Sequence, residues 1–121
     1  MPYNTNTVTT SLATKLYVDT NVTTTPRTNL TGAAGTFYLG EVDNRMNPDK
    51  AIWLKLYDHA SPTNASDPLM VLYTGPSSIG RFVFPEGVTF ATALSVLVAT
   101  SPLVNQGTNP TNKVTVKLLA V

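Results

Sequence analysis

Hydrophobic and polar residues alternate with a period of two in several short stretches, a pattern typical of β-strands with one buried face. The clearest stretch is AIWLKLYD at residues 51–58, in which one face is aliphatic and the other combines two aromatic rings with a lysine. The two faces hold Ile52, Leu54 and Leu56, and Trp53, Lys55 and Tyr57. The first face is predicted to lie in the hydrophobic core, and the second is expected to be covered by a loop, an arm or a neighbouring subunit.

Similar runs predict seven strands after residue 35, separated by segments rich in Pro, Gly, Asn, Asp and Ser. They span residues 36–42, 51–57, 69–74, 81–84, 88–90, 93–99 and 113–119. The last, in KVTVKLLAV, places Leu119 on the face of the lysines. Seven short strands without a helix predict an all-β domain over residues 36–121, with two antiparallel sheets in a β-sandwich and jelly-roll or Greek-key-like connections.

Residues 1–35 differ in composition and predict an extended N-terminal arm. Twelve of the 20 threonines fall within residues 1–36, and the apolar residues there are too irregularly spaced for a clean strand. A short helix over residues 8–18 fits part of the spacing, but the threonine content argues against it. Two interpretations stay open, a flexible tail and an arm that becomes ordered on a neighbouring subunit. In both, residues 36–121 fold without it.

The low content of charged residues limits the kinds of molecule that the protein is expected to bind. Charged residues make up 12% of the chain and the formal net charge is +1, whereas soluble domains carry about 25% charged residues. Nucleic-acid binding needs clustered Lys and Arg side chains, and because those of this chain are scattered, we set this class of function aside. No apolar run is long enough to span a membrane, and the N-terminus lacks the features of a signal peptide. The absence of cysteine excludes disulfides and thiolate sites.

Candidate chemistry is sparse. The only histidine, His59, opens a turn-rich run and is expected to be an exposed loop residue. Glu41, Asp43 and Asp49 are the only carboxylates whose spacing suggests a weak divalent-cation site, without an EF-hand pattern. No nucleophile, nucleotide or metalloprotease motif occurs. We therefore expect no enzyme activity, catalytic residue, metal, cofactor or small-molecule substrate, and keep carbohydrate binding by exposed aromatics as a lesser alternative.

Three stretches resemble one known family. WLKLYDHASPTNASDPLMVL, FPEGVTFATALSVLVAT and KVTVKLLAV are similar to segments of the small β-sandwich virion proteins of tailed bacteriophages. The resemblance covers roughly residues 36–121 and leaves out the threonine-rich segment. The run FATALSVLVATSP departs from the family pattern, in which this segment is richer in Gly and Asp.

The resemblance implies a structural role on the capsid surface of a virion whose parts are made in the host cytoplasm. Capsid cement or decoration proteins bind the major capsid protein, commonly as homotrimers, and brace the shell. The alternative is a tail, neck or fibre component, including a host-glycan adhesin. Candidate interface residues are Leu12, Leu16 and Val18 as a latch, and Trp53, Tyr57, Phe82 and Phe84 as anchors.

Overall fold

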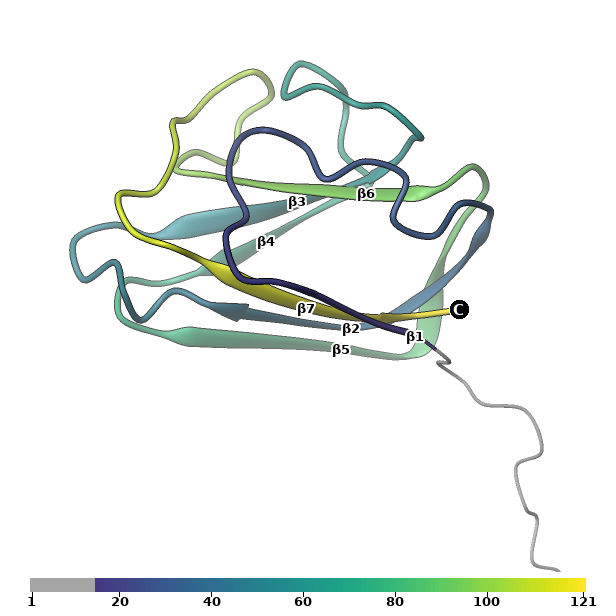
Figure 1. Cartoon of the computed structure of the whole chain (residues 1–121), viewed down its shortest axis with the longest axis horizontal. Coiled ribbons are helices and arrows are strands. Elements are labelled where there is room, and N and C mark those ends of the chain that lie inside the picture. The colour runs from purple at the N-terminus through teal and green to yellow at the C-terminus, as the bar shows by residue number, and fades with distance from the viewer. Residues whose placement is uncertain (1–14) are drawn as a thin grey trace, which may run out of the picture.

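Two antiparallel sheets face each other in the structure, a computed structural model that describes residues 15–121 (Figure 1). One sheet has the strand order β1-β7-β2-β5 and the other β4-β3-β6. The described residues contain no helix, and none that could cross a membrane. The strands are β1 (Lys15–Asp19), β2 (Gly35–Asp43), β3 (Ile52–Asp58), β4 (Met70–Thr74), β5 (Ile79–Phe90), β6 (Leu94–Ala99) and β7 (Thr115–Ala120). The predicted all-β class is confirmed.

One apolar core fills the space between the sheets, and alternation along the strands supplies it. β3 contributes its predicted aliphatic face, which is fully buried. The facing strands β2 and β7 contribute Phe37, Val42, Val116 and Leu118. Each buried aliphatic side chain stabilises the fold by about 1.5–3 kcal/mol, so this shared core holds the two sheets together.

Strand β5 is one long strand where the sequence predicts two. The FPEG segment was expected to be a turn, but its register against β2 passes from Phe37↔Val88 to Leu39↔Val83, so residues 84–87 bulge out between those pairs. Gly87 permits the bulge because its φ of 80° suits glycine, and a Cβ there would clash with Thr36.

Residues 15–35 lie on the two sheets, so the predicted arm is not confirmed from residue 15 onward. β1 pairs with β7, and Val22 is fully buried in the core. Residues 23–30 run along β6, where Arg27 and Val96 exchange backbone hydrogen bonds of 2.8 and 3.0 Å. The threonine-rich chain is extended, as β-branched residues favour, and the sheets satisfy its backbone. Residues 1–14, including Leu12, lie outside the described residues.

Two loops, residues 59–69 and 100–112, cover the outer face of β3 and lie side by side above it (Figure 1). Beneath them Lys55 is fully buried, and burial lowers its pKa. Its Nζ donates hydrogen bonds to Asn64 Oδ1 (2.9 Å) and to the carbonyl oxygens of Leu103 (2.8 Å) and Gln106 (3.3 Å). One ammonium group therefore ties both loops to β3. Of the three covers expected for this face, a loop, an arm or a neighbouring subunit, the structure shows loops.

Asp58, the last residue of β3, organises the turn between β5 and β6. Its carboxylate accepts hydrogen bonds of 2.8 Å from the backbone N–H groups of Ala91 and Thr92. These N–H groups hold the pKa of Asp58 below its ordinary value, because they favour the ionised form. The charged carboxylate thus stabilises the folded chain.

Replacing Asp58 with asparagine is expected to lower stability at neutral pH and much less in acid. A lowered carboxyl pKa contributes stability above the unfolded value, and this is lost as pH falls through the folded value. Urea unfolding at pH 7 and at about pH 2 measures both limits. Asp67→Asn, in the following loop, is the control because Asp67 is exposed. A stability loss in Asp58→Asn that is the same at both pH values would contradict the assignment.

Candidate interaction surface

The outer face of the four-stranded sheet carries an unbroken apolar row across all its strands. Direct cross-strand pairing joins Leu16 of β1 to Leu119 of β7, Leu119 to Leu39 of β2, and Leu39 to Val83 of β5. Directly paired side chains lie on the same face, about 4.5–5.5 Å apart. Leu16 and Val83 are 59% and 63% exposed, and the inner two are half-buried. We call these four residues the apolar row.

A second row, in which three of the four residues are charged, runs beside the apolar row, two residues away along each strand. It consists of Val18, Lys117, Glu41 and Arg81 in direct cross-strand pairing. Glu41 is held between two cations: Arg81 Nε lies 2.8 Å from Glu41 Oε2, and Lys117 Nζ lies 4.0 Å from Oε1. The face therefore combines an apolar strip with a mostly neutralised polar strip, a composition suited to being covered.

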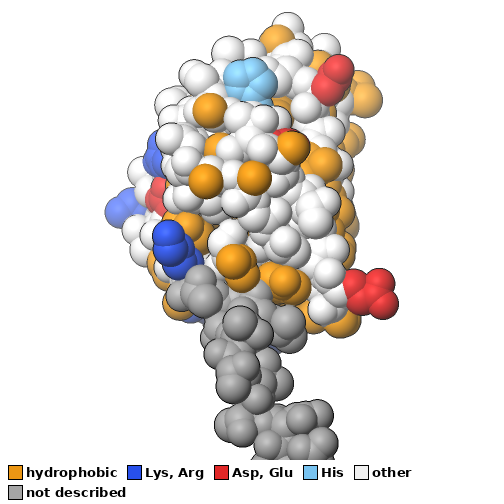
Figure 2. All heavy atoms as spheres, turned by 90° about the vertical axis from the view of Figure 1, so that its right-hand side faces the viewer, with side chains coloured by type: hydrophobic (Ala, Val, Ile, Leu, Met, Phe, Trp, Pro, Cys, Tyr) orange, Lys and Arg blue, Asp and Glu red, His pale blue; other side chains and the backbone are white. Residues whose placement is uncertain are grey.

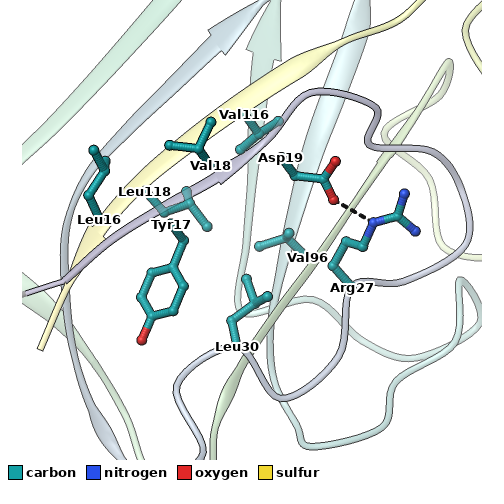
Figure 3. A pocket seen from close by; sticks show the side chains of 9 residues that line it. All are labelled: Leu16, Tyr17, Val18, Asp19, Arg27, Leu30, Val96, Val116 and Leu118. Atoms are coloured by element: carbon teal, nitrogen blue, oxygen red, sulfur yellow. Dashed lines mark hydrogen bonds and ion pairs between the residues drawn. The ribbon is translucent and has the colours of Figure 1, made fainter.

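A groove runs along the edge of β1, between this strand and residues 23–30 (Figure 3). Its volume is about 290 Å³ and its lining is mainly apolar. We call it the edge groove; it is lined by Leu16, Tyr17, Val18, Asp19, Arg27, Leu30, Val96, Val116 and Leu118.

An ion pair between Arg27 and Asp19 lies at one end of the edge groove (Figure 3). Burial acts to raise the pKa of Asp19, but the backbone N–H of Asn21 and the Arg27 guanidinium outweigh it and hold the pKa below its ordinary value. Arg27 also donates to the carbonyl oxygen of Asn21 at 2.7 Å. These bonds fix the start of the 20–34 segment against β1.

The structure separates the predicted interface residues. Leu16 and Val18 are exposed on β1 and belong to the lining of the edge groove. Phe82 and Phe84 are half-buried and pack against the core, so they are not free anchors. Tyr57 is fully buried, its hydroxyl has no hydrogen-bond partner among residues 15–121, and burial raises its pKa. Because it is buried in a cluster with Leu97 and Ala99, Tyr57 is not available as a surface anchor.

Trp53 keeps a partly exposed position at the outer face of the three-stranded sheet. It pairs across the strands with Tyr73 of β4, and their ring centroids lie 5.3 Å apart at an angle of 58°. Tyr73 is 54% exposed. This aromatic pair belongs to the other sheet, so Trp53 and Leu16 do not form one surface.

Sequence reasoning missed Leu39, Val83 and Leu119 as surface residues. A weak signal existed, since Leu119 was assigned to the face of the lysines, where an apolar residue is out of place. The row itself depends on cross-strand register, which a local pattern does not determine. In the sequence, Leu119 is a single apolar residue on an otherwise polar face. In the structure it pairs with Leu16 and Leu39 and lies within the apolar row.

His59 and Asp43, two of the candidate residues for chemistry, take part in local structure. His59 is an exposed loop residue, as expected, and its Nδ1 accepts a hydrogen bond of 2.8 Å from the backbone N–H of Ser61. Asp43 binds Arg45, whose side-chain hydrogen bond lowers the pKa of that carboxyl. Within residues 15–121 no cluster of three potential ligands could hold a metal ion.

Charged side chains are few on the side of the molecule shown in Figure 2, and apolar ones are scattered among uncharged polar groups. A surface of this kind loses little charge hydration when another protein covers it. Comparison of the chain with protein families finds no family that matches, and comparison with curated proteins finds no match.

Proposed function

We propose that this protein is a bacteriophage virion structural protein, a capsid cement or decoration protein that binds the major capsid protein and stabilises the shell. The observation that carries the binding role is the apolar row, a strip across four strands that no residue of the described part of the chain covers at its two ends, Leu16 and Val83. The resemblance of residues 36–121 to small phage virion proteins supports the proposal that the protein is part of a phage particle. We propose that the chain works as a homo-oligomer, with a trimer favoured.

The order of the strands supports a jelly-roll form of β-sandwich. The chain passes from β1 to residues 23–30 beside β6, back to β2, and then to β3 and β4 of the other sheet. It continues to β5, β6 and β7, which lie in alternate sheets. Residues 23–30, which bridge to β6 at Arg27 and Val96, run along the three-stranded sheet where a jelly roll would have its eighth strand. Jelly rolls of this kind occur in viral capsid and lectin domains.

Binding through a sheet face suits a protein that acts in many copies. Exposed apolar patches on monomers usually mark contact surfaces. Burial of the row contributes about 25 cal/mol for each Å² of apolar area removed from water. A modest gain at each copy adds up over a shell, so bracing does not require a tight single site.

The first test counts copies of this chain in purified particles of the phage that encodes it. Quantitative mass spectrometry with the major capsid protein as internal standard gives the number directly. A cement protein is expected in amounts comparable to the capsid lattice, whereas a few copies would indicate the neck or tail. Absence from the particles would overturn the virion role altogether.

Val83→Asp is expected to weaken binding to particles by about tenfold or more, because it places a charge in the apolar row. Folding should be unaffected because Val83 is 63% exposed. Leu103→Asp is the matched control, since Leu103 is 64% exposed but lies in the 100–112 loop over the opposite sheet. Co-sedimentation of each variant with particles that lack the protein measures the affinity. Equal loss in both variants would exclude the row as the binding face.

The aromatic pair of Trp53 and Tyr73 favours a second candidate function, adhesion to a host glycan by a tail, neck or fibre component. An exposed tyrosine beside a half-buried tryptophan is a possible stacking surface for a sugar. The 58° angle between the rings makes a poor flat platform. Few copies per particle, with retention on host polysaccharide, would favour adhesion over the cement role.

A further inference from the structure

The two sides of the molecule differ in how the sheets meet. On one side β4 and β5 lie in contact, which joins the two sheets there. On the other side the edge groove separates β1 from residues 23–30. Core residues of both sheets, Val96 of β6 and Val116 and Leu118 of β7, line it (Figure 3). The groove therefore leads from the surface to the core.

An extended peptide is the ligand that fits this place. Among the described residues β1 pairs only with β7, so its other edge presents backbone N–H and C=O groups. Such an edge accepts an added strand, with main-chain bonds giving affinity and alternate side chains entering pockets. The volume of about 290 Å³ is at the lower end for ligand pockets, roughly 300–1,000 Å³. It suits a few aliphatic side chains.

The sequence of residues 1–14 has the features of such a strand. Val8 and Leu12 lie four positions apart, so an extended chain places both on one side. Between Thr7 and Thr14 there is no Gly, Pro, Asn or Asp, the residues that favour a tight reversal. To reach the edge of its own β1, the segment would have to reverse immediately before Lys15. Extended, it spans up to about 45 Å, enough to reach another molecule.

We propose that the edge groove binds residues 1–14 of a second copy of this chain. The main chain of that segment pairs with the edge of β1, and Val8 and Leu12 enter the groove between β1 and Leu30. Each copy offers one segment and one groove, so exchange closes a ring of any small number of copies. The exchange is a property of the purified chain and holds or fails independently of capsid binding.

Native mass spectrometry of the full-length chain tests the proposal. We expect the chain to associate, and Leu12→Asp to weaken association by about tenfold or more, because a charge would enter an apolar groove. Ser11→Asp is the matched control, since residue 11 lies on the other side of an extended strand. Circular dichroism checks that both variants fold. A monomeric full-length chain, or equal association of the two variants, would overturn the proposal.

Disulfide trapping distinguishes the second copy's segment from other occupants, because the chain has no cysteine of its own. Ser11→Cys in one chain is mixed with Leu16→Cys or Val18→Cys in an isotope-labelled chain, which together sample the neighbouring registers. A disulfide between unlike chains supports exchange. Bonds between two Val18→Cys chains, or an internal bond in a monomeric double variant, would instead show β1–β1 pairing or self-docking. Leu103→Cys, equally accessible but remote, should form no bond with Ser11→Cys.

Discussion

Deletion of residues 1–35 is expected to abolish cooperative folding, although the composition of this segment suggests a dispensable arm. The deletion removes β1, the fully buried Val22 and the half-buried Leu30. It also removes the backbone partners of Val96 and Val98 along β6. Each buried aliphatic side chain contributes about 1.5–3 kcal/mol, and an unpaired buried backbone group costs about 1–3 kcal/mol. The sum approaches the whole stability of a domain, about 5–15 kcal/mol.

Urea unfolding followed by tryptophan fluorescence and far-ultraviolet circular dichroism measures the effect. Deletion of residues 1–14 is the matched control, because β1 begins at Lys15 and keeps its pairing with β7. That shorter deletion is expected to retain a single cooperative transition. Its midpoint is compared with that of the full-length Leu12→Asp variant, in which association is weakened, so that loss of association is not mistaken for loss of folding. A cooperative transition of undiminished midpoint after deletion of residues 1–35 would show that β1 and Val22 are not needed for the fold.

Lys55→Met is expected to destabilise the chain by about 2–4 kcal/mol and to release both loops. Methionine fills a similar volume but leaves Asn64 Oδ1 and the carbonyl oxygens of Leu103 and Gln106 without their shared donor. Each buried acceptor left unpaired costs about 1–3 kcal/mol, and water recovers part of this where the loops open. The loss should therefore appear both as lower global stability and as local exposure.

Hydrogen exchange of the loop amides, together with thermal unfolding, separates these two effects. Lys117→Met is the matched control, since Lys117 lies on a strand but is exposed and 4.0 Å from its carboxylate partner. Exposed ion pairs contribute only about 0–1 kcal/mol. Faster exchange confined to residues 59–69 and 100–112 is expected in Lys55→Met alone. If the two lysine variants unfold alike, the buried ammonium is not what holds the loops.

Period-two alternation predicted the strands that form the core, and the structure explains where it failed. β3 and β7 were recognised because one face of each is buried along its whole length. β1 was missed because two of its three exposed residues, Leu16 and Val18, are apolar. β5 was divided in two because Pro85 and Gly87 are turn residues, yet β2 runs past them as a continuous partner.

Burial and surface contacts were harder to predict, because they depend on segments distant in sequence. Lys55 and Tyr57 share a face with Trp53, but only the first two are fully buried. Lysine is almost never fully buried without partners, and its partners here come from residues 64, 103 and 106. The apolar row likewise depends on the register between four strands. The sequence pattern reveals each strand separately but not how the strands align.

The way Lys55 holds its loops bears on how this protein can diversify. Two of its three acceptors are main-chain carbonyl oxygens, which residues of every type carry. Substitution of the side chains at 103 and 106 leaves these contacts in place, provided that the backbone keeps its path. Exposed loops tolerate sequence change far more readily than the strands they connect. The 100–112 loop can therefore acquire new recognition properties by mutation while its attachment to the framework is inherited unchanged.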